Sequence, residues 1–257
     1  MKYPVRLKNI LSRICRLTDG RIGLEKGDEF SWRGKSIYIL SWKSKSLHSP
    51  KPEASHPVPC YICPVPLPLV LASQSPRRRE LLATAGIPFT IRVREVEEIR
   101  APGEPPEAYV RRLARAKADA VWESRDEIVL GADTIVVLGD VLEPEVLEKP
   151  RDAADARDML RRLSGREHTV ITGICLRHPH GTEVDSSATL VRFAPMTDAE
   201  IDAYVATGEP MDKAGAYAIQ GLASKFIERV EGCYFNVIGL PLSQVYRYLK
   251  TLEKDVA

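Results

Sequence analysis

A short stretch, residues 73–78, combines hydroxyl and guanidinium side chains at the predicted start of a helix. Ser73 and Ser75 are followed by Pro76, which suits the first helical turn because its missing N–H needs no partner there. Ser75 is the predicted N-cap. Arg77 and Arg78 come next, and guanidinium groups, free backbone N–H groups and the helix dipole all attract phosphate. The stretch predicts a phosphate-binding loop, and a capped helix with a solvated basic face is the alternative.

Two charged residues interrupt apolar patterns further along the chain. Asp133 lies inside the apolar run 128–138. A carboxylate in a buried strand is costly unless it is paired, binds a metal or faces a cleft, and such conflicts tend to mark functional sites. The alternative is an aspartate satisfied by backbone N–H groups at a bulge. Lys117 shares the apolar face of a predicted helix with Val110, so it needs a counter-charge unless its ammonium group reaches solvent.

Further polar candidates stand in predicted turns. Lys149 lies in a turn-like segment, where functional cations often occur. Gln220 lies between two glycines, and its amide can recognise the edge of a nucleotide base. Glu98 follows a predicted strand and could supply a metal-binding carboxylate or belong to a solvated acidic turn. Glu209 and Asp212 could be ligands, but we interpret them as residues of a solvated turn.

The elements that must position these residues alternate between strands and helices from residue 67 onward. Apolar or alternating runs predict strands at 67–72, 89–96, 128–138, 168–177 and 188–193. Periodic runs predict helices at 76–85, 106–122, 197–206 and 241–252, with one more between a cap at Asp152 and Ser164. This alternation predicts an α/β domain with a central sheet.

Composition and charge exclude several classes of protein. The chain has 257 residues, of which 44% are hydrophobic and 28% charged, and no apolar run approaches the length of a membrane span. Residues 1–66 carry 12 Lys and Arg against 5 Asp and Glu, which leaves 25 against 30 for residues 67–257. This mildly acidic part does not predict a nucleic-acid binder. Five cysteines, an odd number, favour a reduced, cytoplasmic setting.

Residues 1–66 differ from the rest by being basic and, from residue 50 to residue 68, dense in proline. Such composition favours extended, poorly packed chain. We therefore expect a poorly ordered leader or a start assigned too early, followed by the globular domain 67–257. Cys60 and Cys63 form a lone CxxC pair, for which a zinc site and incidental cysteines are the two interpretations.

Several sequence blocks in a fixed order resemble the Maf family of nucleotide pyrophosphatases. The blocks are 71–78 (LASQSPRR), 131–134 (GADT), 147–150 (LEKP), 163–168 (LSGREH), 207–210 (TGEP), 212–217 (DKAGAY), 219–221 (IQG) and 236–242 (NVIGLPL). Each block alone is weakly specific, but their common order is highly specific. The resemblance covers about residues 67–257, the same part of the chain that is predicted to be globular.

The resemblance implies a mixed central sheet wrapped by helices, with two lobes around a deep cleft as in Maf-like and ITPase-like folds, in a homodimer. It implies hydrolysis of a nucleoside triphosphate between its α and β phosphates with Mg²⁺ or Mn²⁺, as house-cleaning of the nucleotide pool. Blocks 212–217 and 219–221 resemble the subgroup that acts on dTTP, UTP and modified pyrimidine triphosphates. The alternatives are a 7-methyl-GTP-type pyrophosphatase and a non-catalytic regulator of cell division that acts by binding.

The resemblance also implies roles for individual residues. By position, Asp133 matches the proton acceptor. The positions linked to substrate choice are matched by Arg77, Thr134 and Gln220. Other polar cleft positions are matched by Ser73, Arg78, Glu98, Lys117 and Lys149. We expect the Ser73–Arg78 loop, including Ser75, to hold the triphosphate, the two lysines to neutralise the leaving pyrophosphate, and Glu98 with Asp133 to bind the metal.

Overall fold

The computed structural model describes residues 29–32, 35–38, 67–139 and 144–256. The chain divides into two units, residues 1–58 and 59–257. In the first unit, strand β1 (Glu29–Trp32) pairs antiparallel with β2 (Lys35–Tyr38), a hairpin that the sequence patterns do not predict. The remainder of the predicted leader, including Cys60 and Cys63, lies outside the described residues.

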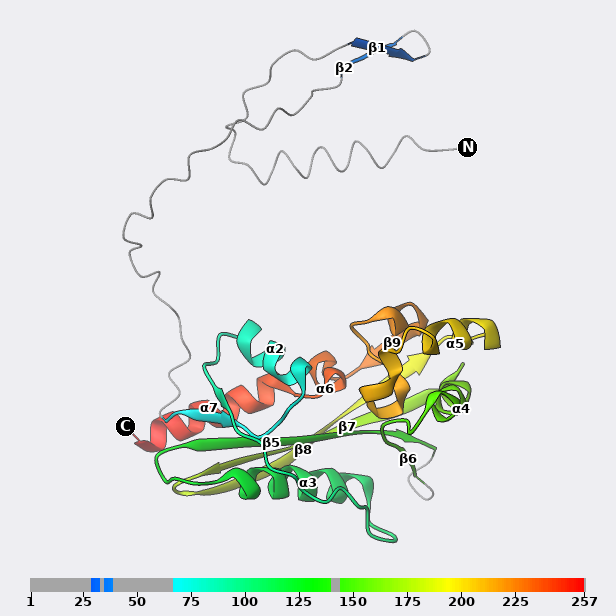
Figure 1. The fold of residues 1–257 in the computed structure, drawn as a ribbon. Helices are drawn as coiled ribbons and strands as arrows, with labels where there is room; N and C mark the ends of the chain where they lie inside the picture. Colours follow the sequence, from blue (N-terminus) through cyan, green and yellow to red (C-terminus); the bar gives the residue numbers. More distant parts are fainter. Residues whose placement is uncertain (1–28, 33–34, 39–66, 140–143, 257) are drawn as a thin grey trace. The chain divides into compact units, whose positions relative to one another are not determined.

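The second unit is built on a mixed seven-stranded sheet (Figure 1). Its strands are β3 (Leu69–Leu71), β4 (Thr90–Ile91), β5 (Ile128–Leu138), β6 (Glu145–Leu147), β7 (Glu167–His178), β8 (Gly181–Phe193) and β9 (Ile227–Glu231). The order is β4-β3-β5-β7-β8-β9, and β6 also pairs with β5. β3 runs parallel to β4 and β5, whereas the other pairs are antiparallel. The expected mixed central sheet is therefore confirmed.

Helices cover both faces of this sheet. They are α2 (Pro76–Thr84), α3 (Pro106–Val121), α4 (Ala153–Leu163), α5 (Asp198–Val205), α6 (Tyr234–Ile238) and α7 (Leu242–Val256), with short 3₁₀ helices η1 (Glu209–Asp212), η2 (Ala214–Ala216) and η3 (Leu222–Phe226). Figure 1 shows α3 on one face and α2, α6 and α7 on the other. Within the described ranges, no helix is long and apolar enough to cross a membrane.

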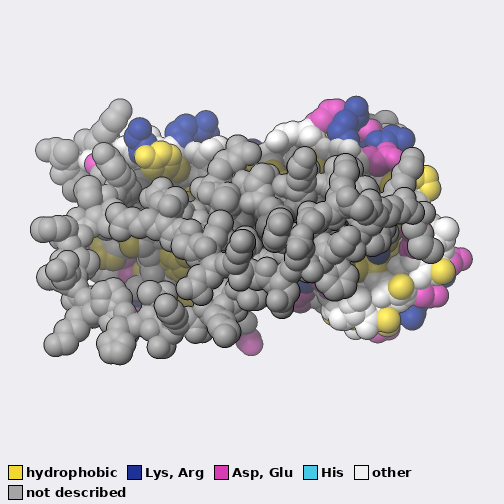
Figure 2. Space-filling view, turned by 90° about the horizontal axis from the view of Figure 1, so that it is seen from above, with side chains coloured by type: hydrophobic (Ala, Val, Ile, Leu, Met, Phe, Trp, Pro, Cys, Tyr) yellow, Lys and Arg dark blue, Asp and Glu magenta, His cyan; other side chains and the backbone are white. Residues whose placement is uncertain are grey.

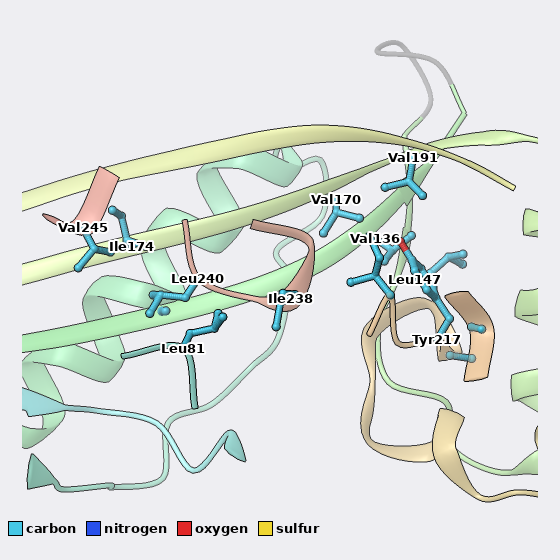
Figure 3. Packing of buried hydrophobic residues seen from close by; sticks show 14 of the residues in the cluster. Leu81, Val136, Leu147, Val170, Ile174, Val191, Tyr217, Ile238, Leu240 and Val245 are labelled. Carbon is cyan, nitrogen blue, oxygen red and sulfur yellow. The ribbon is translucent and has the colours of Figure 1, made fainter. Parts of the chain in front are cut away.

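Burial on both faces explains why β5 is apolar along almost its whole length. Ile135 and Val137 pack against α3 in one cluster with Tyr109 of that helix, whereas Val136 belongs to the larger cluster on the opposite face. Figure 3 shows part of that cluster, in which Val136 and Leu147 of β6 lie near Tyr217. Removing this apolar surface from water is the main force that holds the helices on the sheet.

Local signals place the helix starts, and three of the predicted caps are confirmed. Ser75 caps α2, Asp152 caps α4, and Thr197 with Glu200 forms the capping box of α5. Strand extents differ more from the prediction. The run 89–96 contributes only β4, and β8 begins seven residues before the predicted start at 188. Residues 181–187 are mostly polar and are half-exposed or exposed, so pairing with β7 rather than an apolar pattern makes them a strand.

Charged side chains of both signs mix at the end of the domain that carries α4 and α5 (Figure 2). Arg157 Nε lies 2.6 Å from Asp202 Oδ1, and Arg161 Nε lies 2.7 Å from Asp198 Oδ1, so ion pairs join the two helices. Exposed pairs of this kind contribute about 0–1 kcal/mol each to stability. This end of the domain is therefore neutralised locally rather than charged with one sign.

Candidate active site

A gap in the sheet beside β5 opens into a cleft. β7 pairs with one edge of β5 across Val129–Val137. On the other edge, β3 pairs with Ile128–Leu130 and β6 pairs with Val136–Leu138. Residues 131–135 therefore have no strand partner on that edge within the described part of the chain, and their backbone groups face the space between β3 and β6. A cleft of about 1000 Å³ lies there.

The cleft brings together every residue that the sequence analysis predicted for the site. Its lining includes Ser73, Ser75, Arg77, Arg78, Glu98, Lys117, Asp133, Thr134, Lys149 and Gln220. The β3–α2 loop and α6 form one wall, and the segment 209–221 forms the other. The two lobes expected from the resemblance are these two walls. The catalytic and binding roles of the individual residues stay predictions.

The centre of the cleft is a lysine held between two carboxylates. Lys117 Nζ lies 2.6 Å from Asp133 Oδ1 and 2.6 Å from Glu98 Oε1. The side chain of Lys117 is 15% exposed and that of Asp133 is 11% exposed, whereas that of Glu98 is 46% exposed. Although burial raises the pKa of Glu98, the ammonium groups of Lys117 and Lys149 outweigh it and lower this pKa. Lys117 thus has the counter-charge that its position required.

Close packing of α3 on the sheet places Lys117 at this point. Asp133 pairs with Gly173 of β7 in an uninterrupted ladder, which excludes the bulge as an explanation for a carboxylate in this strand. A Cβ atom on Gly173 would lie 2.3 Å from the backbone oxygen of Val110, so only glycine lets α3 lie this close to the sheet. The ammonium group of Lys117 can therefore reach Asp133 from the neighbouring helix.

The carboxylates of Glu98 and Asp133 suit a hard divalent cation. Each has one oxygen on Lys117 Nζ and a second oxygen left for another partner. Among the described residues, no group of three or more His, Cys, Asp and Glu side chains is placed to hold a metal ion. Mg²⁺ is usually held by one or two carboxylates together with substrate phosphates and water. The two residues therefore fit a cation shared with a phosphate ligand rather than an all-protein cage.

Arg78 and the two serines organise the predicted phosphate-binding loop. Ser73 Oγ accepts hydrogen bonds from Ser75 N at 3.2 Å and from Arg78 Nη1 at 3.1 Å. Ser75 Oγ accepts from Arg78 N at 3.5 Å, which is the helix cap. Because the Ser73 hydroxyl already accepts two hydrogen bonds, its proton is the group that it can offer to a ligand.

Arg78 also starts a directional chain of hydrogen bonds beneath the loop. Its Nε donates to Gly239 O at 2.7 Å, and its Nη2 donates to Thr134 Oγ1 at 2.9 Å. Thr172 Oγ1 donates to Asn236 O at 3.1 Å, so the 2.9 Å contact between the two threonine hydroxyls must have Thr134 as its donor. Arg78 is 9% exposed, and burial lowers its pKa while Asp133 opposes this change. Two of its five N–H donors remain for a ligand.

The outer cleft carries the remaining predicted residues. Arg77 Nη1 reaches across the cleft to Asp212 Oδ2 at 3.3 Å. Asp212 Oδ1 also lies 2.5 Å from Lys213 Nζ. Burial raises the pKa of Asp212, but Lys213 and Arg77 outweigh this effect and lower it. Lys149 and Gln220 are exposed residues of the cleft lining.

Two residues with structural roles at the cleft, Tyr109 and Thr172, were not among the predicted site residues, and a third, Glu209, was predicted in a different role. The Tyr109 hydroxyl lies 3.0 Å from Glu98 O and 2.8 Å from Glu148 Oε1, and it links the loops of Glu98 and Lys149. Nothing in the sequence marks Tyr109 as a site residue, because its ring fits the apolar face of its helix. Thr172 is a polar residue in a buried strand, so the argument used for Asp133 could have found it. The third is Glu209, for which the solvated-turn interpretation was wrong because its carboxylate accepts internal hydrogen bonds.

Comparisons with known proteins find relatives of this chain. A model of the family described as Maf-like protein matches residues 68–252. A dTTP/UTP pyrophosphatase of Anaeromyxobacter dehalogenans (strain 2CP-C) is 55% identical over 186 residues, which cover 71% of this chain and 92% of that protein. A dTTP/UTP pyrophosphatase of Koribacter versatilis (strain Ellin345) is 50% identical over 183 residues, covering 71% of this chain and 93% of that protein.

More distant similarity is found as well. A dTTP/UTP pyrophosphatase of Bacillus cereus (strain AH820) is 48% identical over 189 residues, covering 73% of this chain and 97% of that protein. The solved structure of the Staphylococcus aureus Ham1 protein is similar with 13% identity and a TM-score of 0.40, covering 71% of this chain and 98% of that chain. Because the family model spans most of the chain and the relatives match it over nearly their whole length, the chain belongs to the Maf family.

Proposed function

We propose that this protein is a nucleoside triphosphate pyrophosphatase that hydrolyses dTTP and UTP to the monophosphate and pyrophosphate. The observation that carries the proposal is that all ten predicted residues line one cleft, at the gap in the sheet beside Asp133. Relatives that are 48–56% identical bear the name dTTP/UTP pyrophosphatase, which supports the same activity and the same nucleotides.

The inner cleft binds the triphosphate. The Ser73 hydroxyl, the free backbone N–H groups at the start of α2 and the Arg77 guanidinium present donors to phosphate oxygens. Lys117 offsets one of the two negative charges of Asp133 and Glu98, which weakens the repulsion that an anionic ligand meets at these carboxylates. Lys149 adds a further positive charge from the loop after β6.

Asp133 accepts a proton from the water that attacks the α-phosphorus. The new bond joins that water oxygen to the α-phosphorus, and the bond from the α-phosphorus to the bridging oxygen breaks. The departing pyrophosphate takes the electron pair, and lysine ammonium groups stabilise its growing negative charge. A divalent cation, Mg²⁺ or Mn²⁺, bound by Glu98 and Asp133 would supply additional positive charge to the phosphate oxygens.

The experiment measures pyrophosphate release from dTTP, UTP and 7-methyl-GTP with Mg²⁺ and with Mn²⁺. We expect dTTP and UTP to be hydrolysed, and the Asp133→Asn variant to be slower by about 10²–10⁴-fold, the usual loss of a general base. Preference for 7-methyl-GTP would indicate the other subgroup. A folded protein that releases no pyrophosphate from any nucleotide would instead favour a binding role in cell division.

We also propose that the enzyme works as a homodimer in the cytoplasm without nucleic acid. Support for the dimer comes from the family resemblance, and support against nucleic acid comes from the mildly acidic charge of residues 67–257. A native mass measurement tests the dimer, for which a monomer mass at assay concentration would be the contrary result.

A further inference from the structure

We propose that Tyr204 and Glu209 form a clamp that positions Gln220 to recognise the nucleotide base. The proposal rests on the proposed function, because it concerns how that cleft selects its nucleotide. Neither residue was a candidate for specificity in the sequence. Tyr204 lies on the buried face of α5, and Glu209 begins η1.

The clamp holds the backbone on both sides of Gln220. Two residues before it, Ala218 N donates to the Tyr204 hydroxyl at 3.3 Å. Two residues after it, Leu222 N donates to the Glu209 carboxylate, at 3.0 Å from Oε1 and 3.1 Å from Oε2. The backbone that carries Gln220 is therefore fixed at two points, while its side chain stays exposed in the cleft.

The two clamp residues are themselves tied together and to the protein. The Tyr204 hydroxyl donates to Glu209 Oε1 at 2.9 Å. Burial, together with the neighbouring Glu209 carboxylate, raises the pKa of Tyr204, so this hydroxyl keeps its proton. Lys213 Nζ donates to Glu209 O at 2.6 Å and fixes the backbone of Glu209 as well. The Tyr204 ring packs edge-to-face on Phe226, with centroids 6.3 Å apart.

Gly221 makes the close approach of the carboxylate possible. A Cβ atom at this position would lie 2.2 Å from Glu209 Oε1, which real structures do not allow. The Glu209 side chain therefore lies directly against the backbone next to Gln220. This packing leaves little freedom for the loop that carries the glutamine.

A fixed backbone matters because a mobile loop would lose conformational freedom when its glutamine binds a base, and it would discriminate poorly between bases. A group held in its binding geometry beforehand loses less on binding, and a small misplacement weakens discrimination. The Ser73–Arg78 loop, which we expect to hold the triphosphate, lies on the opposite wall. The clamp should therefore affect the choice of base more than the rate of the chemical step.

The test compares kcat/KM for dTTP and dCTP, whose bases differ at the pairing edge. In Tyr204→Phe, which keeps the ring and removes only the hydroxyl, we expect the dTTP:dCTP ratio to fall about tenfold, as for one lost hydrogen bond to a charged group. We expect kcat for dTTP to stay within about threefold, because the phosphate-binding wall is untouched. Tyr248→Phe is the matched control, since its hydroxyl donates to Asp185 Oδ2 at 2.8 Å outside the cleft lining.

A double-variant cycle tests whether the clamp acts through Gln220. Once Gln220→Ala has removed the amide, adding Tyr204→Phe should change the ratio no further. The proposal would be overturned if Tyr204→Phe lowered the dTTP:dCTP ratio equally in the wild type and in Gln220→Ala. It would also be overturned if Tyr204→Phe lowered kcat/KM equally for both nucleotides, or if the wild-type ratio were near one.

Hydrogen exchange at the Leu222 amide gives a readout that does not depend on activity. We expect protection in the wild type and faster exchange in Glu209→Gln and Tyr204→Phe, and unchanged exchange in both variants would overturn the clamp. If the wild-type enzyme releases no pyrophosphate, the proposed function fails and base recognition fails with it. Loss of Leu222 protection in the variants would then still identify the clamp, so the two failures are distinguishable.

Discussion

Replacing Lys117 with methionine would leave two carboxylates without the cation that they share. Its Nζ lies 2.6 Å from both Asp133 and Glu98, and the Asp133 side chain is only 11% exposed. Removing one partner of a buried ion pair costs about 3–5 kcal/mol. The side chain of Glu98 is 46% exposed and regains water, so we expect a loss at the lower end, about 3 kcal/mol. For a domain of this size, that loss corresponds to a fall in Tm of about 6–12 °C.

The stability lost in Lys117→Met should depend on pH in a defined direction. The pKa of Glu98 is lowered from its ordinary value of 4.5 in the folded protein, because the nearby ammonium groups outweigh the effect of burial. Its contribution to stability is therefore present above pH 4.5 and is lost as the pH falls through the lower folded value. Lys117→Met lacks most of this contribution, so the difference from the wild type should be largest at neutral pH and shrink in acid.

Urea unfolding of both proteins at neutral pH and below pH 4.5 measures this difference. Lys250→Met is the control, because Lys250 is an exposed helical lysine outside the cleft lining. We also expect pyrophosphate release by Lys117→Met to fall by about 10²-fold or more, since charge stabilisation of this kind is a large term in catalysis. A variant as stable as the wild type at neutral pH, or a difference that grows in acid, would refute the reasoning.

Three further changes test other contacts of the cleft. Tyr109→Phe should lower stability by about 1–2 kcal/mol in urea and raise the Mn²⁺ concentration needed for half-maximal activity, because the Glu98 loop loses its tether. Thr172→Val should cost about 1–3 kcal/mol in the same assay, since it leaves buried groups of the Arg78 chain unsatisfied. Asp212→Asn should lower KM for dTTP about two- to fivefold at low salt, because it removes the anion that competes for the phosphate-binding arginine.

Local sequence signals predicted the parts of the fold that local forces determine. The run 128–138 corresponds residue for residue to β5, because both faces of that strand are buried and every position but the site is apolar. The caps at Ser75 and Asp152 are equally local, since each needs only a side-chain oxygen three residues before a free N–H group. Such features can be predicted without knowing what the rest of the chain does.

Features that depend on distant partners could not be predicted in the same way. The first half of β8 has no apolar pattern and becomes a strand because β7 offers a ladder. The strand β9 and the short helix α6 also lie outside the predicted elements, and β9 pairs with the end of β8. In these segments, tertiary contacts rather than propensity decide the backbone conformation.

The site residues also divide into those that a local signal predicts and those that it does not. Asp133 and Lys117 could be predicted because a charge in an apolar pattern is visible in the sequence and requires a partner. Tyr109 and Tyr204 fit the apolar pattern of their helices, because a tyrosine ring can occupy a buried position. Their hydroxyl groups, which contact Glu148 and Glu209, leave no trace in that pattern. No local signal shows that the pairing of β5 with β3 ends at Leu130, or that its pairing with β6 begins at Val136. The strand β5 can be predicted from its own residues. The gap between β3 and β6, which opens the cleft beside β5, depends on how the whole sheet assembles.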